Sequence, residues 1–426
     1  MLKKFLEYCR QKNLIKLNDS VLLSVSGGSD SVFMLKLFNE IKNVFNLKLG
    51  IAYIDHKIRD VKKEIIFVKN FAKNYGIPFY LAKINISNVG SLEELLRIKR
   101  LKALKEISKK YNFSKIALAH TKDDQAETIL MRFLKGASLR GLSGIKPIND
   151  NVFIHPILVF SKEEILNFLK ENKIPFLQDP TNYNLSFLRN KLRHKILPFL
   201  EREINPNLKE NLIRMANNLL EDENYLKEKA KLSFNEILKD TNPFPHFDRQ
   251  KFLKLDEAIK NRILISILMD YNFRWESKHI ELLKEFIKNK PNKNAKFLNK
   301  NLTFISTCDN IYICPFNTPP EPIFLKKGKK NHFVGWRSSI NFSKKTGDFL
   351  IEEDMISKLK LTSIAHNKNF KKDIKNLKLP YPLRDYLPII SIGNKIIWIP
   401  GFYKEEFSNP KNKIFMRWNY EVNKNT

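Results

Sequence analysis

The sequence predicts an α/β fold: a Rossmann-like parallel sheet with helices on both faces, followed by a mainly helical domain and a small α+β C-terminal domain. Three observations lead to this prediction. Short apolar runs alternate with segments of helical periodicity over residues 21–160, long amphipathic patterns follow over 205–290, and strand-like runs return after residue 302. Strands that alternate with helices are typical of βαβ units and hence of a parallel sheet.

The first region begins with an apolar run at 21–25, which is typical of a strand buried on both faces. A glycine turn follows, and then an apolar helix is expected over 32–45. The alternation continues with strands at 49–54, 79–84 and 116–119 and with helices at 62–75 and 92–111. Ligands of such sheets bind beyond the carboxyl ends of the strands, so functional residues are expected there.

The later regions change character after residue 182. Amphipathic helices are expected at 205–239, 248–271 and 277–290, and strands at 302–313, 389–392 and 395–399. A proline- and lysine-rich stretch at 315–330 is typical of an interdomain linker. We therefore expect domains at 1–200, 201–314 and 331–426.

Composition narrows the classes of function. The chain has 426 residues, 43% of them hydrophobic, and a net charge of +31. Such a surplus favours a polyanionic partner such as nucleic acid, although a lysine-rich composition would also produce it. Three cysteines without a CxxC pair exclude a disulfide framework or a cysteine-only zinc site. Without a signal peptide or a long apolar run, we expect a cytoplasmic protein that does not enter a membrane.

The glycine turn after the first strand suits an anion. It consists of Ser26, Gly27, Gly28, Ser29, Asp30 and Ser31. Two glycines let the backbone approach a phosphate closely, and the N–H groups of the following helix point at it. Asp30 could hold a magnesium ion against phosphate oxygens. The alternative is that Ser29 or Asp30 only caps the helix.

An acidic cluster follows the fourth strand. Asp123 lies four positions and Asp124 three positions before Glu127, in a helix that begins at the carboxyl edge of the sheet. Residues at these spacings can share one face of a helix. Carboxylates at this place could bind magnesium, recognise an ammonium group or take a proton from an amine. The alternative is a capping box between Thr121 and Asp124.

Two motifs together carry a family resemblance. SGGSDS at 26–31 and AHTKDDQAET at 119–128 resemble the tRNA(Ile)-lysidine synthetase family of the N-type ATP pyrophosphatases, or PP-loop enzymes. Further matching pieces stand in the family's order: Asp55-His56, Arg97 and Arg100, GLSGI at 141–145, and Arg189, Asn190 and Arg193 within 179–198. The segments 384–388 and 396–401 resemble the family's terminal domain, although the arginine-glycine-aspartate stretch expected before them is missing around 361–370.

The resemblance implies an adenine nucleotide alpha-hydrolase-like fold and a specific ligase activity. ATP would adenylylate the wobble cytidine of the CAU anticodon of tRNA(Ile), and free L-lysine would then replace AMP at C2 of the base. Pyrophosphate and AMP would be released. The implied cofactors are ATP and Mg²⁺.

The resemblance also implies roles for single residues. Nucleotide binding would involve residues 26–31 together with Asp55 and His56. Asp30, Asp123, Asp124, Glu127 and Arg193 would be catalytic, and Asp30 with Asp123 would hold the metal. The tRNA would contact Arg97, Arg100, Arg140, Arg189 and Arg384. From its own residues, three glycines and Arg140, the loop at 135–146 is expected to be a mobile lid over the active site.

From the residues alone, alternatives stay open. Asp55 and His56 could be a turn pair, Arg97 and Arg100 a solvated stripe, and Arg189 part of a basic linker helix. Two other functions are a PP-loop tRNA thiolase and a basic tRNA-binding protein without activity. A thiolase requires cysteines, and the catalytic half contains only Cys9, outside the expected sheet. The oligomeric state is open, and a homodimer is one option.

Overall fold

The computed structural model describes residues 1–57, 60–84, 92–178, 188–289, 296–299, 302–316, 318–326, 330–366, 368–376, 381–407 and 412–421. The chain divides into two units, Met1–Glu223 and Asn224–Thr426. The boundary falls inside the long helix α10 (Leu208–Ile237), so the three expected domains stay a prediction. In the described part of the chain, no helix has both the length and the apolar character that a membrane span requires.

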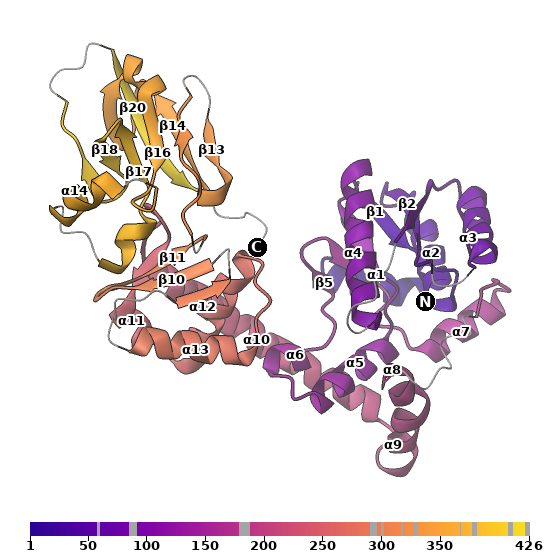
Figure 1. The fold of residues 1–426 in the computed structure, drawn as a ribbon. Coiled ribbons are helices and arrows are strands. Elements are labelled where there is room, and N and C mark those ends of the chain that lie inside the picture. Colours follow the sequence, from indigo (N-terminus) through magenta and orange to yellow (C-terminus); the bar gives the residue numbers. More distant parts are fainter. Residues whose placement is uncertain are drawn as a thin grey trace. The chain divides into compact units, whose positions relative to one another are not determined.

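The first unit is built on a six-stranded sheet with the order β3-β2-β1-β4-β6-β5 (Figure 1). Its elements follow the predicted alternation: α1 (Leu2–Gln11), β1 (Ser20–Ser24), α2 (Ser29–Ile41), β2 (Lys48–Asp55), α3 (Lys62–Tyr75), β3 (Phe79–Lys83), α4 (Leu92–Tyr111), β4 (Lys115–Ala117) and α5 (Lys122–Leu134). The pairs β1–β2, β1–β4, β2–β3 and β4–β6 are parallel. The predicted Rossmann-like parallel sheet is therefore confirmed.

Alternate residues of β1 explain why helices cover both faces. Val21 and Leu23 are fully buried in a hydrophobic cluster that includes residues of α1, α2, α3 and α7. Leu22 points to the other face and joins Leu104 of α4 in a second cluster. Since successive side chains of a strand point to opposite faces, an uninterrupted apolar run requires this double cover.

The remainder of the first unit adds two strands at one edge of the sheet and then a series of helices. Its elements are α6 (Leu139–Leu142), β5 (Ile148–Asn149), β6 (Phe153–Ile154), α7 (Lys162–Glu171), α8 (Leu188–Lys191), a π-helical turn (Leu192–Ile196), α9 (Leu197–Glu203) and the start of α10. Strand β5 pairs antiparallel with β6. These two-residue strands were not predicted.

The second unit begins with helices that pack on a sheet. The end of α10 joins α11 (Arg249–Leu253), α12 (Glu257–Asp270) and α13 (Ser277–Lys288). Their sheet has the order β7-β8-β11-β10-β9, formed by β7 (Leu238–Asp240), β8 (His246–Asp248), β9 (Lys296–Asn299), β10 (Leu302–Ser306) and β11 (Asn310–Cys314). The single helix expected at 248–271 is wrong: α11 ends at Leu253, and α12 begins after Asp256, whose backbone is extended.

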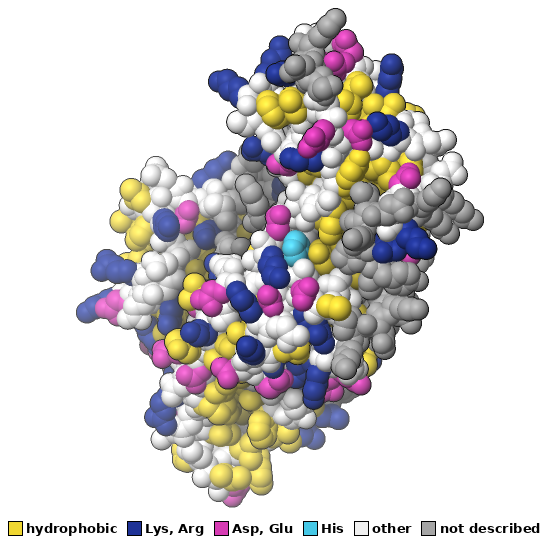
Figure 2. All heavy atoms as spheres, turned by 90° about the vertical axis from the view of Figure 1, so that its left-hand side faces the viewer, with side chains coloured by type: hydrophobic (Ala, Val, Ile, Leu, Met, Phe, Trp, Pro, Cys, Tyr) yellow, Lys and Arg dark blue, Asp and Glu magenta, His cyan; other side chains and the backbone are white. Residues whose placement is uncertain are grey.

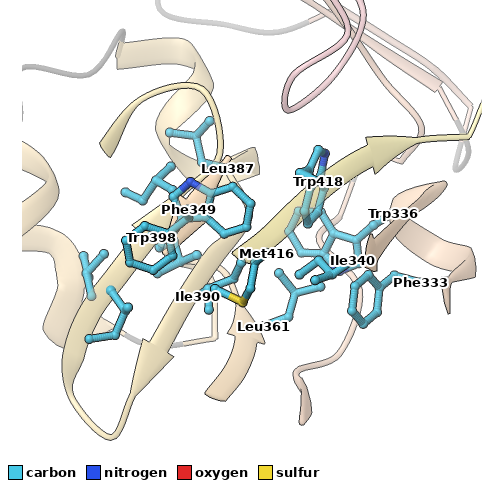
Figure 3. Packing of buried hydrophobic residues seen from close by; sticks show 14 of the residues in the cluster. Phe333, Trp336, Ile340, Phe349, Leu361, Leu387, Ile390, Trp398, Met416 and Trp418 are labelled. Atoms are coloured by element: carbon cyan, nitrogen blue, oxygen red, sulfur yellow. The ribbon is translucent and has the colours of Figure 1, made fainter. Parts of the chain in front are cut away.

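The C-terminal part is rich in β-structure and contains two sheets. One has the order β12-β16-β17-β18-β19 and the other β13-β14-β20-β15. Their strands are β12 (Ile323–Phe324), β13 (Asn331–Phe333), β14 (Ser338–Ser343), β15 (Phe349–Glu352), β16 (Leu359–Thr362), β17 (Ile389–Ile392), β18 (Lys395–Ile399), β19 (Tyr403–Lys404) and β20 (Lys413–Tyr420), and the helix is α14 (Lys371–Asn376). Figure 3 shows large side chains from both sheets packed against one another.

Aromatic packing joins these sheets to the stretch that precedes them. Phe349 of β15 stacks on Trp398 of β18 with ring centroids 5.6 Å apart. Phe316 and Leu325 are buried in the same cluster, and β12 pairs with β16. The described part of the stretch 315–330, expected as an interdomain linker, therefore packs with its apolar side chains Phe316 and Leu325 into the core of the C-terminal part.

Candidate active site

The glycine turn lies between β1 and α2, as predicted. Gly27 has a left-handed φ of +89°, which a residue with a side chain rarely adopts. Gly28 is the N-cap of α2 and supplies no side-chain cap to its first turn. Ser31 donates from its hydroxyl to the carbonyl of Gly28 at 2.8 Å and accepts from the N–H of Ser26 at 3.2 Å, which ties the turn together. The uncapped N–H groups of α2 can therefore receive an anion.

A second segment supports the same turn. The N–H of Leu177 donates to the carbonyl of Gly27 at 2.9 Å. A Cβ atom added to Gly27 would lie 3.2 Å from the side chain of Leu177. The turn is thus held closely by the chain that follows α7, and a larger residue at Gly27 would be strained in both backbone and packing.

Asp124 and Glu127 form a buried network with two arginines. Arg189 donates from Nε to Glu127 Oε2 and from Nη2 to Asp124 Oδ1, both at 2.9 Å. Arg193 donates to Glu127 Oε1 at 2.5 Å and to Asp124 Oδ1 at 2.9 Å. Only 2% of the Glu127 side chain is exposed. Two carboxylates and two guanidinium groups balance in charge, which makes their burial tolerable.

The two arginines change the pKa of Asp124. Burial alone would raise the pKa of the Asp124 carboxyl, but Arg189 and Arg193 outweigh burial and hold its pKa below the ordinary value. The pKa of Arg193 is raised, because its bonds to Glu127 outweigh its own burial. The arginines therefore stabilise the charged form of Asp124.

Asp124 is also a helix cap. Its Oδ2 accepts from the N–H of Thr121 at 2.8 Å, and the hydroxyl of Thr121 accepts from the N–H of Asp124 at 3.3 Å, so the capping box at the start of α5 exists. The capping role and the proposed chemical role of Asp124 are therefore compatible. One oxygen of Asp124 caps the helix while the other faces the arginines.

Asp123 is separated from that pair. Its Oδ2 accepts from the backbone N–H of Lys162 at 2.6 Å, and its Oδ1 pairs with Lys209 Nζ at 3.0 Å. Asp30 lies on the other side of Lys162, whose ammonium is 2.6 Å from Asp30 Oδ1. Burial raises the pKa of Asp30, and Lys162 works against that rise.

These contacts bear on the predicted magnesium ligands. Lysine ammonium groups already contact both Asp30 and Asp123, and in the described part of the chain no three side chains of the ligating types gather at one place. The two carboxylates therefore do not form a ready ligand pair. The magnesium site stays a prediction.

Asp55 is the last residue of β2, and His56 follows it and lies near Arg100 of α4. The carboxylate of Asp55 accepts from the N–H of Lys57 at 2.8 Å, as the turn alternative expects. Burial and the charge of Arg100 lower the pKa of His56. Burial lowers the pKa of Arg100 and the charge of Asp124 works against that, so Arg100 of α4 and Asp124 of α5 lie in one region. Arg97 is exposed.

Arg140 lies in α6, on the loop between α5 and β5. Arg132 donates from Nη1 to the carbonyls of Gly141 and Gly144, both at 2.8 Å. The amide of Gln125 forms two bonds with the backbone of Ile145, at 2.5 and 3.1 Å. The loop is thus fastened to α5, which fits a rigid element better than the expected lid. Arg384 lies in the second unit, in a 3₁₀ turn (Tyr381–Tyr386).

Sequence reasoning missed two residue groups of the site. Lys162 contacts the glycine turn from 132 positions away in the chain, and only its position at the start of a capped helix could have indicated it. His120 and His155 lie with ring centroids 4.8 Å apart beside Asp124. His120 stands inside the quoted motif, whereas no pattern in the sequence indicated His155.

The chain is similar in sequence to known proteins. The PP-loop domain family matches residues 2–200, and the TilS substrate C-terminal domain matches residues 357–418. A tRNA(Ile)-lysidine synthase from Caldanaerobacter subterraneus subsp. tengcongensis is 31% identical over 453 residues, covering 97% of this chain and 96% of that protein. A tRNA(Ile)-lysidine synthase from Clostridioides difficile is 30% identical, and the match covers 99% of this chain and 97% of that protein. Among solved structures, the U34-tRNA thiolase NcsA from Methanococcus maripaludis covers 52% of this chain and 80% of its own, with 21% identity and a TM-score of 0.45.

Proposed function

This chain belongs to the tRNA(Ile)-lysidine synthase family, and we propose that its site joins free L-lysine to the wobble cytidine of a CAU-anticodon tRNA(Ile). It is an ATP-using PP-loop ligase that modifies tRNA. The observation that carries the proposal is the buried network of Asp124 and Glu127 with Arg189 and Arg193. In this network two carboxylates, which suit an ammonium substrate, lie beside two guanidinium groups, which suit a phosphate, and this supports the proposal.

The proposed reaction has two steps. The carbonyl oxygen at C2 of cytosine attacks the α-phosphorus of ATP, an O–P bond forms, and pyrophosphate leaves. The ε-amine of lysine then attacks C2, the C–O bond breaks, AMP leaves, and the amine loses a proton. Adenylylation makes the second step feasible, because AMP is a far better leaving group than an oxide ion.

The residues divide the work by their chemistry. The N–H groups at the start of α2, with the hydroxyls of Ser26 and Ser29, suit the departing pyrophosphate. Arg193 offsets the charge that develops at the α-phosphate. Glu127 or Asp124 binds or deprotonates the incoming amine. Both carboxylates already pair with arginines, so the ammonium takes the place of a guanidinium, and Arg189 or Arg193 becomes available to phosphate.

Outer residues would hold the RNA and the base. Asp55 and His56 contact the adenosine or the cytosine, and the tRNA backbone runs over basic side chains: Arg97, Arg100, Arg140, Arg189 and Arg384. Arg100 and Arg189 lie near Asp124, which supports a path of the RNA past the network. We also propose that Mg²⁺ accompanies ATP, that the enzyme works in the cytoplasm where tRNA is found, and that it forms a homodimer.

One assay tests the proposed function. The full-length protein is incubated with ATP, MgCl₂, labelled lysine and a tRNA(Ile) transcript that carries CAU. We expect label in the RNA, with one AMP and one pyrophosphate released per lysine. The matched control is the same transcript with uridine at the wobble position, which should stay unlabelled. A transcript that binds the enzyme and stays unlabelled in the presence of ATP would contradict the proposal.

A further inference from the structure

The helix that carries the two arginines of the site contains a π-helical turn. Arg189 lies in α8 and Arg193 in the π-helical turn Leu192–Ile196, and the helix continues through this turn into α9. At the end of the turn, the N–H of Leu197 donates to the carbonyl of Leu192, which lies five positions back and not four. Turns of this kind are rare and are found frequently at functional sites. The residues that cause this turn are therefore candidates for a role in the reaction.

Pro198, the second residue of α9, explains why the turn forms at this place. It has no N–H to donate to the carbonyl of His194, four positions back, and in an α-helix its ring would collide with that carbonyl. The helix avoids the collision by widening just before the proline, so that one hydrogen bond spans five residues. Pro198 is itself exposed, so its ring does not fill a core. Its effect is therefore on the course of the backbone.

The turn decides which side chains of this helix are buried. Leu192 and Leu197 are each 1% exposed, whereas Ile196 is 42% exposed. In a regular α-helix, residues five positions apart point in directions about 140° apart, and Ile196 would share the face of Leu192. The π-helical turn, which has more residues per turn, brings Leu197 to that face instead. Arg189 lies before this shift and Arg193 within it, so the shift also sets the direction in which both arginines leave the helix.

The contacts of Arg193 depend on that direction. Its Nε donates to Glu127 Oε1 at 2.5 Å and its Nη2 to Asp124 Oδ1 at 2.9 Å. Arg189 donates to the same two carboxylates. In the proposed reaction the ammonium of lysine displaces a guanidinium from Glu127 or Asp124, so these ion pairs weaken just when an arginine must face phosphate. The backbone then remains to keep the arginine directed at the site.

We propose that Pro198 is a positioning residue for the reaction, because it holds the π-helical turn and thereby keeps Arg193 directed into the network of Asp124 and Glu127. This inference rests on the proposed function, which gives Arg193 its role at the α-phosphate. Pro198 acts only through the backbone, by preventing the helix from taking the regular register. A residue with an N–H at this position removes that constraint.

The first test replaces Pro198 in the full-length protein and measures lysine incorporation into the CAU transcript. Pro198→Ala allows a regular helix, and Pro198→Gly also has the N–H but is a weaker helix former than alanine. For Pro198→Ala we expect kcat to fall about tenfold or more, because a misdirected guanidinium no longer offsets the charge at the α-phosphate. The KM values for ATP and tRNA should stay within about twofold of the wild type. Pro198→Gly should keep more of the kcat than Pro198→Ala.

Thermal unfolding separates this effect from general damage to the fold. Alanine is the best helix former of the three residues, so Pro198→Ala should unfold at or above the Tm of the wild type and above that of Pro198→Gly. The order of the two variants in Tm is then opposite to their order in kcat. The matched control is Pro206→Ala, which removes an exposed proline between α9 and α10 and should keep the wild-type kcat. If kcat falls with Tm, so that Pro198→Gly is the worse variant in both, Pro198 is merely structural and the inference is wrong.

A crystal structure of Pro198→Ala tests the inference without an activity measurement. We expect the N–H of Leu197 to donate to the carbonyl of Arg193, four positions back, and the guanidinium of Arg193 to lose at least one of its bonds to the carboxylates. An N–H of Leu197 that still donates to Leu192 would overturn the inference, because the proline would not cause the turn. A wild-type enzyme that leaves the transcript unlabelled contradicts the proposed function itself. An active wild type with an unchanged kcat in Pro198→Ala contradicts only the role of Pro198.

Discussion

Asp124 is a buried residue that contributes both to helix capping and to the charged network of the site. Asp124 caps α5 with one oxygen and faces two guanidinium groups with the other. Removing one member of such a network leaves an uncompensated charge inside the protein, which costs about 3–5 kcal/mol. The arrangement therefore stays closed until a ligand supplies a replacement charge. A substrate ammonium and a phosphate together provide that exchange.

The neighbouring histidines predict a pH dependence of stability. Burial lowers the pKa of His155 from its ordinary 6.5 to about 4. Between these values the unfolded chain binds a proton that the folded chain refuses, so stability falls as the pH drops below 6.5. From pH 7 to pH 5 the loss for one such group is about 2 kcal/mol. The variant His155→Gln keeps a donor for the carbonyl of Lys146 but has no group that titrates. We expect its free energy of unfolding to fall by about 2 kcal/mol less than that of the wild type between pH 7 and pH 5.

Urea titrations at both pH values, followed by far-UV circular dichroism, measure this effect. The tryptophans provide an internal control, because all four lie in the second unit, at Trp275, Trp336, Trp398 and Trp418. Tryptophan fluorescence therefore reports unfolding of the second unit. The transition of the first unit, which contains His155, should be the one that shifts with pH. Equal acid losses in the wild type and His155→Gln would rule out His155 as the cause.

At the scale of elements, the loop between α5 and β5 behaves as an extension of α5. Arg132 and Gln125 fasten it from the same helix that carries Asp124 and Glu127. Arg132→Met removes two hydrogen bonds to the loop backbone without touching the carboxylates. We expect faster hydrogen exchange over 136–146 and a higher KM for tRNA, with the KM for ATP little changed. The exposed neighbour Lys135, changed to Met, is the matched control, and unchanged exchange in Arg132→Met would show that the loop is held by other contacts.

The sequence predicted those elements whose pattern is local. The apolar run of β1 and the glycine turn before α2 depend on neighbouring residues, so their positions could be inferred directly. The grouping of Asp124 with Glu127 also follows from helical spacing. Asp123 also lies at helical spacing from Glu127, but its carboxylate contacts Lys162 and Lys209 and not the arginines.

The unpredicted features depend on contacts between distant segments. Lys162 reaches Asp30 across 132 positions, and Arg189 reaches Asp124 across 65. Strand β5 has two residues, which is too short for any periodicity to show. The break before α12 was missed because Asp256 lies between two apolar helical patterns that read as one. Each of these follows from tertiary packing, which single-sequence patterns do not contain.

At the scale of the whole molecule, the net charge of +31 is the dominant property. Figure 2 shows that on the face it presents, Lys and Arg side chains are spread among Asp and Glu and do not gather in one patch. A dispersed surplus of this kind attracts a large polyanion over a wide surface. It thereby supports binding of a whole tRNA through many phosphate contacts, each of modest strength.

Salt dependence tests this view and the predicted role of Arg384. A protein that makes 6–10 phosphate contacts loses about a thousandfold or more in affinity between 50 and 200 mM salt. We expect this steep loss for the tRNA complex, measured by filter binding. For Arg384→Gln the slope of log affinity against log salt should fall by about one, because one phosphate contact is lost. Lys395→Gln is the matched control, since Lys395 is exposed on the same C-terminal part and already pairs with Glu405 at 2.7 Å. If Arg384→Gln keeps the wild-type slope, the RNA does not contact Arg384 through phosphate, and binding by the C-terminal part must rest on other side chains.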